Sequence, residues 1–376
     1  MSGTSLDGLD IALCSCKGSG TNTKIKILKF LTVPYESDFK ADVKSIFSKR
    51  EVDLQKVCLL NASIGTLHGE MILKTLNEWG VDSKDVDLIA SHGQTIYHAP
   101  KSFHGLASYP NATLQIGDGD HIAVTTGIIT LSDFRQKHVA AGGEGAPLAV
   151  YGDYLLFHKS GENRIMLNIG GISNFTFLPG DLKKAAMFST DIGPGNTLID
   201  QYVQKYFNGL LYDEDARIAK NGTANVNLLT ALLSQSFLNL DLPKTTGPEL
   251  FNLDYLQKAQ QESGTSQLNG EDVLATLCLF TSTAIADALN GSFKQMSLTI
   301  YVSGGGMHNP LIMQHLKNLV ANSKFHTTAK LKVNPDAKEA VLFALLANES
   351  VAGGDTSFGD SVKLPSGCMG KISMPN

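Results

Sequence analysis

Three glycine-rich turns, each next to a strand-like pattern, constrain the fold of this chain more than any other feature. They are Gly3 to Gly8, Leu167 to Asn174 and Ser303 to Gly306. Around them, short segments of alternating apolar residues, which predict strands, take turns with longer segments of helical periodicity. Such alternation is typical of α/β domains, because helices cover the faces of a sheet. We therefore predict an α/β fold.

The individual segments follow this alternation. The predicted strands are residues 9–13, 24–32, 86–91, 165–169, 175–177 and 298–302. The predicted helices are residues 51–80, 197–207, 272–289 and 310–320, the last of them capped by Asn309-Pro310. Gly170-Gly171 joins two of the strands as a hairpin turn. Residues 133–147 fit neither period, and we expect an ordered irregular loop there.

Composition places the chain among globular proteins. Of its 376 residues, 43% are hydrophobic and 18% are charged, which supplies enough apolar surface for a buried core. The length corresponds to two or three domains at roughly 150 residues each. The 31 basic and 36 acidic residues give a net charge of −5, so we exclude nucleic acid as the main partner.

Cysteine usage and hydropathy indicate the compartment. Cys14, Cys16, Cys58, Cys278 and Cys368 are scattered and form no C-x-x-C pair, as expected for free thiols in a reducing compartment. The sequence does not open on a basic segment followed by an apolar one, and no uncharged apolar run reaches the roughly 18 residues that span a bilayer. We therefore expect a cytoplasmic protein without a membrane partner.

The glycine turns carry the first candidate chemistry. They expose backbone N–H groups without a Cβ in the way, and such groups bind phosphate oxygens. Thr4, Ser5 and Ser173 could add hydroxyl donors, and Asp7 could hold a hydrated Mg²⁺. Ordinary hairpin geometry explains any one turn, but the three together favour a nucleotide site. A P-loop or Rossmann site is disfavoured, because neither sequence pattern occurs.

Asp191 is the candidate base. It lies between Thr190 and a Gly-Pro-Gly turn that leads into a helix, which predicts a carboxylate at the rim where strands end. Pro194 stiffens this support, and a general base needs a stiff support. The local pattern fits a turn or helix-capping aspartate equally well. Asp200, further along the helix, is predicted to be a solvated helix residue.

The histidines match no standard metal site. Those between residues 92 and 138 are separated by spacings unlike those of zinc ligands: His92, His98, His104, His121 and His138. His92, in Ser-His-Gly-Gln-Thr, fits a substrate hydrogen-bond donor and a structural loop histidine about equally. The segment Asp118-Gly119-Asp120 lacks the glutamate and spacing of an EF-hand and is predicted to be a turn. No G-x-S-x-G elbow supports acyl hydrolysis.

Taken together, the motifs resemble those of one family. In chain order, MSGTSLDGLD, SHGQT, DFRQKHVAAGGEGAPL, LNIGGISN, TDIGPGN and SGGGMHNP resemble the motifs of anhydro-N-acetylmuramic acid kinases, over nearly the whole chain. The resemblance implies two actin-like (ribonuclease H-like) lobes, with mixed sheets flanked by helices and an ATP cleft between them. It implies a kinase that uses ATP and Mg²⁺ to open 1,6-anhydro-N-acetylmuramic acid hydrolytically and to phosphorylate O6. The implied setting is peptidoglycan recycling by a cytoplasmic homodimer.

The same resemblance implies residue roles. Asp191 matches the base that activates water for attack at the anomeric carbon. His92, Arg135 and Glu339 match positions that contact the sugar. The implied nucleotide-binding positions are Gly3, Thr4, Ser5, Asp7, Gly8, Asp10, Gly170, Gly171, Gly304, Gly305 and Gly306. Asp7 is also the implied metal ligand.

The resemblance divides the chain as well. It implies an N-terminal lobe of residues 1–130 plus 337–376, with the first phosphate loop. Residues 131–336 would form a C-terminal lobe with the second phosphate loop, Asp191 and the adenosine segment. The family pattern has an apolar strand before the first phosphate loop, whereas Met1 here directly precedes Ser2-Gly3. We expect residues upstream of Met1 to supply that strand.

Two other classes compete with the kinase. A nucleotide-switched binding protein of the actin or chaperone kind predicts a slow ATPase that responds to a polypeptide and not to a sugar, but we find no separate peptide-binding domain in this sequence. A polyphosphate phosphohydrolase of the same superfamily would need a basic channel, which a net charge of −5 does not indicate.

Overall fold

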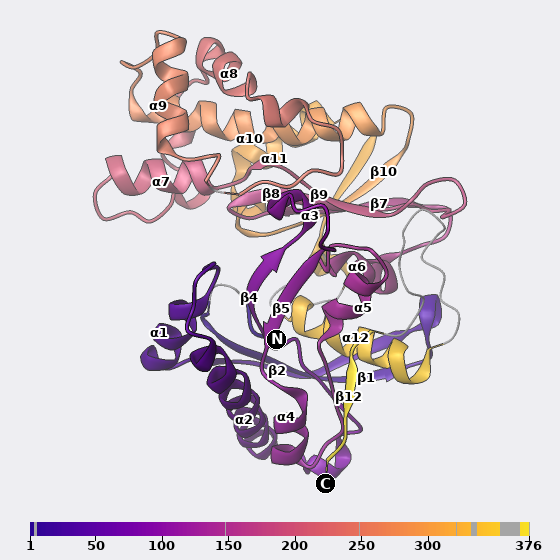
Figure 1. Cartoon of the computed structure of the whole chain (residues 1–376). Helices are drawn as coiled ribbons and strands as arrows, with labels where there is room; N and C mark the ends of the chain where they lie inside the picture. The colour runs from indigo at the N-terminus through magenta and orange to yellow at the C-terminus, as the bar shows by residue number, and fades with distance from the viewer. Residues whose placement is uncertain are drawn as a thin grey trace. The chain divides into compact units, whose positions relative to one another are not determined.

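The computed structural model describes residues 1–3, 6–146, 148–247, 249–320, 322–331, 337–353 and 369–375 (Figure 1). The chain divides into two compact units, one formed by Met1–Leu156 with Asp336–Asn376 and the other by Phe157–Pro335. Each unit combines sheets and helices, so the predicted α/β class is confirmed.

The first unit begins with a long β-hairpin. β1 (Gly8–Lys17) and β2 (Lys24–Pro34) pair antiparallel, and the short 3-10 helix η1 (Gly20–Asn22) lies in the turn. The other strands are β3 (Ile89–Ala90), β4 (Gln94–Ala99), β5 (Ala112–Ile116), β6 (Thr130–Ser132) and β12 (Lys371–Ser373). They form a three-stranded sheet in the order β12-β6-β3 and a second hairpin of β4 and β5. The strand predicted over residues 86–91 is thus shorter than expected.

Helices pack around these strands. They are α1 (Ser37–Ile46), α2 (Leu54–Trp79), η2 (Ser83–Asp85), α3 (Lys101–His104), α4 (Gly119–Thr126), α5 (Phe134–Ala140), α6 (Ala149–Phe157) and α12 (Lys338–Ala352). The long helix α2 has clear end signals: the Asp53 carboxylate accepts the N–H groups of Gln55 and Lys56, and Gly80 ends the helix with φ of 68°. Its residues Leu60 and Ile64 join a buried apolar cluster.

The expectation of an irregular loop over residues 133–147 is wrong for its first half, which forms α5. Phe134 and His138 are buried and lie four residues apart, as on one face of a helix. The helix is too short for a repeating apolar pattern, which is why the sequence did not reveal it. Residues 131–156, which the predicted division gave to the second lobe, belong to the first unit, where β6 pairs with both β3 and β12.

The second unit contains one five-stranded mixed sheet. β7 (Asn163–Ile169), β8 (Ile172–Leu178) and β9 (Phe188–Pro194) form an antiparallel meander. β10 (Leu298–Ser303) pairs parallel with β7, and β11 (Ser323–Thr327) pairs parallel with β10. The order β11-β10-β7-β8-β9 is that of the ribonuclease H-like fold, which confirms the expected fold for this unit. The predicted hairpin turn at Gly170-Gly171 is also confirmed.

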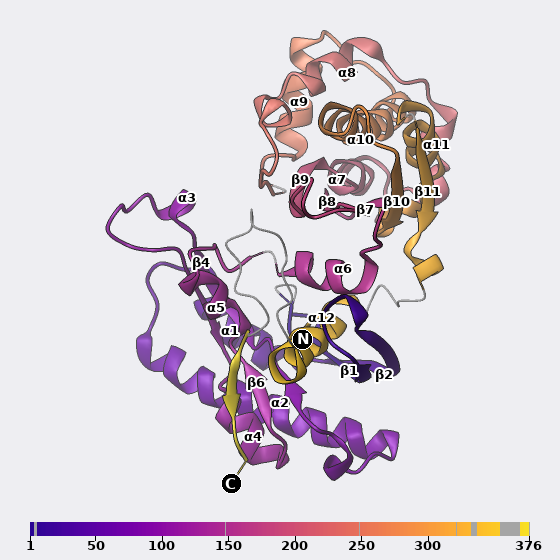
Figure 2. The same cartoon turned by 90° about the vertical axis from the view of Figure 1, so that its right-hand side faces the viewer.

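The helices of the second unit surround α10. They are α7 (Thr197–Tyr206), η3 (Glu214–Ala216), η4 (Ala219–Asn221), α8 (Val226–Leu233), η5 (Ser236–Asn239), α9 (Leu253–Glu262), α10 (Gly270–Ser292), η6 (Gly305–His308), α11 (Pro310–Leu319) and η7 (Thr328–Leu331). Figure 2 shows α10 beside the sheet, and buried residues of both, such as Leu277 and Ile300, share one core. The predicted cap of α11 is confirmed, because the Asn309 side chain accepts the N–H groups of Leu311 and Ile312 at 3.1 Å each.

By hydropathy alone, α10 would be a candidate for a membrane-spanning helix. Among the described residues it is the one helix long and apolar enough to cross a bilayer, but 72% of its most apolar window is buried inside the protein. A helix that is buried to this extent is part of the protein core, so we interpret α10 as a core helix. The cysteines that the structure describes, Cys14, Cys16, Cys58 and Cys278, are free thiols, as expected, and Cys368 lies outside the described residues.

Candidate active site

In the second unit, glycine turns meet at one edge of the sheet. β7 and β10 run parallel and end at Ile169 and Ser303, so the turns that follow them leave the sheet side by side. The turn after β9 joins them through its backbone: Gly195 N–H donates to the Gly171 carbonyl at 2.8 Å, and Asn196 N–H donates to the Gly170 carbonyl at 2.8 Å. The predicted positions 170, 171 and 304–306 are therefore brought together.

Only glycine fits where these turns touch. A Cβ on Gly195 would lie 2.1 Å from the carbonyl oxygen of Gly170. A Cβ on Gly304, where φ is +84°, would lie 2.6 Å from the carbonyl oxygen of Ile169. The Asn196 amide packs against the third turn, 3.3 Å from where a Cβ on Gly305 would lie. Asn196 ends the motif TDIGPGN, but no local pattern in the sequence indicates this contact.

Asp191 lies on β9, in the strand that leads into this convergence. Its backbone N–H donates to the Lys244 carbonyl at 2.9 Å, and its Oδ2 accepts the Thr246 N–H at 2.9 Å. Burial raises the pKa of the Asp191 carboxyl, and the Thr246 N–H opposes that shift. Among the described residues, Oδ1 has no hydrogen-bond partner. One anchored oxygen, one available oxygen and a raised pKa together suit a general base.

The segment that anchors Asp191 is itself held firmly. Thr190 Oγ1 accepts the Lys244 N–H at 2.9 Å. The buried ammonium of Lys244 donates to the carbonyls of Phe237 and Leu238 at 2.9 and 2.8 Å, and burial lowers its pKa. Sequence reasoning missed Lys244 and Thr246, because Thr246 lies 55 residues from Asp191 and no local pattern connects them.

A second group of predicted residues lies in the first unit, around Arg135 on α5. Arg135 Nε donates to His92 Nε2 at 3.0 Å, and Nη1 donates to the Gly145 carbonyl at 2.8 Å. His92 Nδ1 lies 3.0 Å from the Gly93 carbonyl, so Nδ1 carries the proton and Nε2 accepts. Burial, followed by the Arg135 charge, lowers the pKa of His92 to about 3.

His92 is therefore neutral at physiological pH, and both of its ring nitrogens are engaged within the protein. Of the two interpretations of its sequence, this geometry favours the structural one, in which His92 orients Arg135. Glu339, exposed in the first turn of α12, lies near enough for its charge to raise the pKa of Arg135, against the larger lowering effect of burial. The structure thus brings His92, Arg135 and Glu339 together.

His138 completes the surroundings of Arg135. Its Nδ1 accepts the Gly145 N–H at 3.0 Å, so the residue whose carbonyl holds Arg135 is fixed at both backbone groups. A Cβ on Gly143 would lie 2.3 Å from His138 Nε2, which explains a glycine there. From the sequence, His138 stands out only as a possible metal ligand, because Gly143 and Gly145 reach its ring only in the folded chain.

The first glycine turn connects directly to β1. A Cβ on Gly8 would lie 2.3 Å from the Val33 carbonyl oxygen, so the hairpin requires glycine at that position. The Gly3 carbonyl accepts the Gln94 side-chain amide at 3.4 Å. The Asp10 carboxylate accepts the Thr32 hydroxyl at 2.6 Å across the hairpin, whereas Asp7 is exposed. Thr4 and Ser5, two predicted nucleotide-binding residues, lie outside the described residues.

Comparison with known proteins places the chain in a family. The family profile described as anhydro-N-acetylmuramic acid kinase matches residues 1–361. A protein of that name from Pseudoalteromonas atlantica (strain T6c / ATCC BAA-1087) is 56% identical, over 100% of this chain and 94% of the relative. The chain belongs to the anhydro-N-acetylmuramic acid kinase family.

More distant relatives carry the same name. An anhydro-N-acetylmuramic acid kinase from Caldanaerobacter subterraneus subsp. tengcongensis is 36% identical, over 100% of this chain and 96% of the relative. Membership of the anhydro-N-acetylmuramic acid kinase family supports the kinase interpretation over the nucleotide-switched binding protein.

Several solved structures resemble this chain remotely. A ROK family protein from Streptococcus pneumoniae TIGR4 in complex with sucrose is 12% identical, with a TM-score of 0.35 over 90% of this chain and 99% of that one. A ROK family glucokinase from Streptomyces griseus in complex with glucose and AMPPNP is 11% identical, with a TM-score of 0.31 over 89% and 98%.

Proposed function

We propose that this chain uses ATP to convert 1,6-anhydro-N-acetylmuramic acid and water into N-acetylmuramic acid 6-phosphate. Membership of the anhydro-N-acetylmuramic acid kinase family supports the reaction and the substrate. The observation that carries the mechanism is the half-buried Asp191 carboxylate, with Oδ2 fixed by Thr246 and Oδ1 available.

In the proposed reaction, Asp191 acts as the general base. Oδ1 takes a proton from water as the water oxygen bonds to the anomeric carbon C1, and the bond between C1 and O6 breaks. O6 then bonds to the γ-phosphorus of ATP, and ADP leaves. A raised pKa makes this carboxylate a stronger base than an exposed aspartate, and the Thr246 N–H keeps it oriented.

We assign the binding of the ATP phosphates to the glycine turns. Phosphoryl transfer depends on positioning and on charge neutralisation rather than on covalent help, and backbone N–H groups supply both. The converging turns at Gly170-Gly171 and Gly304 to Gly306 fit this role in the second unit. In the first unit, the family resemblance assigns nucleotide binding to the turn from Gly3 to Gly8 and to Asp10.

Asp7 is the proposed ligand of Mg²⁺. Within the described residues no group of three or more His, Cys, Asp or Glu side chains gathers around one point. Mg²⁺ nevertheless fits, because it commonly binds one or two carboxylates together with water and substrate phosphates. Asp7 is exposed, whereas the Asp10 carboxylate is already engaged with Thr32. When bound, Mg²⁺ would neutralise phosphate charge.

The sugar-binding role is assigned to the group around Arg135. Arg135 supplies a cation that His92 and Gly145 hold in one orientation, and Glu339 supplies a carboxylate acceptor for sugar hydroxyls. We extend the proposal to a cytoplasmic homodimer in peptidoglycan recycling on the family resemblance. The first unit would be the N-terminal lobe and the second unit the C-terminal lobe.

Replacement of the proposed base tests the assignment. Asp191→Asn keeps the shape and the Thr246 contact but cannot take a proton at neutral pH, so we expect sugar-dependent ADP release to fall by about 10²- to 10⁴-fold. Binding of a fluorescent ATP analogue should stay unchanged. Asp254→Asn, which changes an exposed aspartate on α9, is the matched control and should retain full activity. If Asp191→Asn turns over as fast as this control, Asp191 is not the base.

A further inference from the structure

Four buried polar side chains form a connected chain of hydrogen bonds in the first unit. They are His68 on α2, Tyr35 directly after β2, Ser2, and Gln94 on β4, and these residues are between 0% and 5% exposed. The Tyr35 hydroxyl oxygen lies 2.8 Å from His68 Nε2 and 2.8 Å from Ser2 Oγ. Ser2 Oγ lies 2.5 Å from Gln94 Oε1. All four residues belong to one compact unit.

The hydrogen bonds of this chain run in one direction. The Gln94 amide nitrogen donates to two backbone carbonyls, at 3.1 and 3.4 Å, so the amide oxygen is the atom that accepts the Ser2 hydroxyl. Since Ser2 has only one proton to donate, Tyr35 donates to Ser2, and His68 Nε2 in turn donates to Tyr35. Each hydroxyl therefore both donates and accepts, and aligned hydrogen bonds of this kind strengthen one another.

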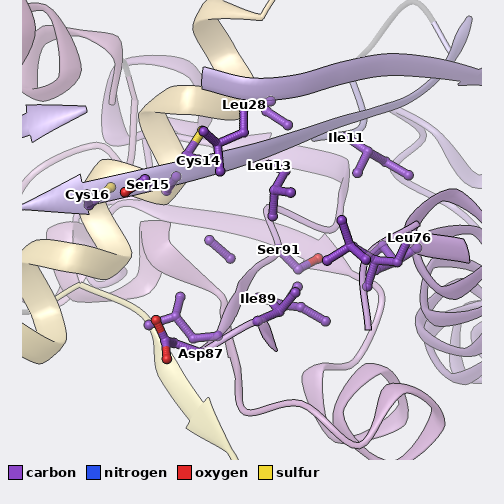
Figure 3. A pocket seen from close by; sticks show the side chains of 18 of the residues that line it. Ile11, Leu13, Cys14, Ser15, Cys16, Leu28, Leu76, Asp87, Ile89 and Ser91 are labelled. Carbon is purple, nitrogen blue, oxygen red and sulfur yellow. The ribbon is translucent and has the colours of Figure 1, made fainter. Parts of the chain in front are cut away.

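Burial keeps the two titratable members of the chain neutral. It lowers the pKa of His68 to about 3, and it raises the pKa of the Tyr35 hydroxyl well above its ordinary value. His68 also lines an apolar groove of about 760 Å³ between β1 and β3, and Figure 3 shows Leu76 and Ile89 in the wall of this groove. Among the described residues, His68 Nδ1 has no hydrogen-bond partner, and it is the nitrogen without a proton when Nε2 donates.

Tyr35 contacts the first glycine turn at both of its ends. Its hydroxyl donates to Ser2, which directly precedes the turn, and its backbone N–H donates to the Asp7 carbonyl at 3.2 Å near the end of the turn. The Gln94 amide adds a hydrogen bond to the Gly3 carbonyl at 3.4 Å. Asp7 is the proposed Mg²⁺ ligand, so Tyr35 fixes the backbone that carries this carboxylate.

The segment that contains Gln94 also carries a residue of the proposed sugar-binding group. His92, which orients Arg135, is separated from Gln94 only by Gly93. A Cβ on Gly93, where φ is +68°, would lie 2.5 Å from the Ile116 carbonyl oxygen, so this segment fits closely against β5. The motif SHGQT therefore connects the proposed sugar-binding group with the first glycine turn through a closely packed backbone.

We propose that Tyr35 and Gln94 are positioning residues, which hold the two ends of the first glycine turn and fix its position relative to Arg135. This inference rests on the proposed function, in which the turn binds ATP phosphates and Arg135 binds the sugar. Phosphoryl transfer depends on the placement of the reacting groups, so a turn held at both ends favours the reaction. Both side chains are buried, and they act through the turn rather than by contact with a substrate.

The first test removes the Tyr35 hydroxyl. Tyr35→Phe keeps the ring and the backbone N–H but deletes the link between His68 and Ser2. Tyr255→Phe in the second unit is the matched control, because it also removes a tyrosine hydroxyl that donates, here to the Leu232 carbonyl. Both variants should lose about 2–4 °C in Tm. We expect the Kd of a fluorescent ATP analogue, measured with Mg²⁺, to rise about 5- to 10-fold in Tyr35→Phe and less than about 2-fold in the control.

Steady-state kinetics supply a measurement that a purely structural role would not change. In Tyr35→Phe we expect KM for ATP to rise with the Kd of the analogue. KM for the anhydro sugar should change by less than about 2-fold, because His92 and Gly145 still hold Arg135. An unchanged Kd in Tyr35→Phe, or an equal rise in both tyrosine variants, would overturn the inference. A parent chain that binds the analogue but releases no ADP with the sugar contradicts the proposed function instead.

The second test changes the other members of the chain, and it applies even if Tyr35→Phe does not fold. His68→Gln keeps an N–H donor for Tyr35, whereas His68→Leu removes it. We expect the analogue to bind to His68→Gln within about 2-fold of the parent and to His68→Leu about 3- to 5-fold more weakly. Gln94→Met removes both hydrogen-bonding ends of the amide and should weaken binding as much as Tyr35→Phe. Equal affinity in the two His68 variants, together with unchanged affinity in Gln94→Met, would contradict the positioning role.

Discussion

Asp191 and Arg135 both depend on groups far away in the sequence. Asp191 is anchored by a backbone N–H 55 residues later, and Arg135 by a histidine 43 residues earlier. The sequence identified both residues because each stands in a local motif. The anchors Thr246 and Lys244 could not be identified in this way, because only the folded chain brings them to Asp191. For His92, the sequence left two roles open, and the orientation of its two ring nitrogens favours the positioning role.

Single glycines hold the turns of the second unit together. In Gly195→Ala the new Cβ would lie 2.1 Å from the Gly170 carbonyl oxygen, so the turns must separate. We expect a loss of about 3 kcal/mol in the free energy of unfolding, measured by urea denaturation. Gly291→Ala is the control, because nothing lies within 4 Å of its Cβ in α10, and we expect a gain of about 0.5–1 kcal/mol. The packing argument is wrong if the two variants have the same urea midpoint.

Buried histidines make stability depend on pH. Burial lowers the pKa of His68 and of His92 to about 3, against 6.5 for the exposed side chain. Between these values the unfolded chain binds protons that the folded chain does not. Stability is therefore fully present above pH 6.5 and falls as the pH drops toward 3, by at most about 1.4 kcal/mol per pH unit for each histidine. Thermal unfolding at pH 7.5 and pH 5 should give a smaller Tm difference in His68→Gln than in the parent chain, and an identical difference would argue against this origin.

At the scale of elements, local signals explain which helices and strands were predicted. The Asn309-Pro310 cap, the glycine at position 80 and the Gly170-Gly171 turn each act within a few residues, and the elements beside them were predicted correctly. The hairpin of β4 and β5 was not predicted, because its strands pair across a long connection that leaves no local pattern. The strand β3 was predicted too long, because its length depends on how far β6 reaches beside it.

The buried Glu349 carboxylate connects helix α12 to the hairpin of β1 and β2 through hydrogen bonds. Glu349 accepts the Gly20 N–H at 2.9 and 3.0 Å and the Thr23 hydroxyl at 3.0 Å, and the glutamate is only 2% exposed. We expect Glu349→Ala to lower the free energy of unfolding by about 2–3 kcal/mol, because charged hydrogen bonds are lost and donors are left buried. Asn348→Ala removes a more exposed contact with Gly18 and should cost less than about 1 kcal/mol. Chemical denaturation compares the two, and equal losses would contradict the role of Glu349.

At the scale of the whole molecule, the motifs spread along the chain were enough to indicate the family, and the family profile matches residues 1–361. The internal division was harder to predict. Residues 131–156 belong to the first unit, because β6 pairs with β3 on one side and with β12 on the other, both in that unit. Such pairing is not visible in the sequence. The proposed roles are distributed accordingly: Arg135 and Glu339 belong to the first unit, and Asp191 belongs to the second.

In the proposed function, one reaction opens the anhydro ring with water and phosphorylates O6. The most direct measurement incubates the chain with ATP, Mg²⁺ and 1,6-anhydro-N-acetylmuramic acid in ¹⁸O-labelled water and analyses the product by mass spectrometry and NMR. We predict one ADP for each sugar consumed, ¹⁸O at C1, and phosphate on O6 without the label. A phosphorylated sugar that keeps its anhydro ring, or ADP release that does not depend on the sugar, would contradict the proposed reaction.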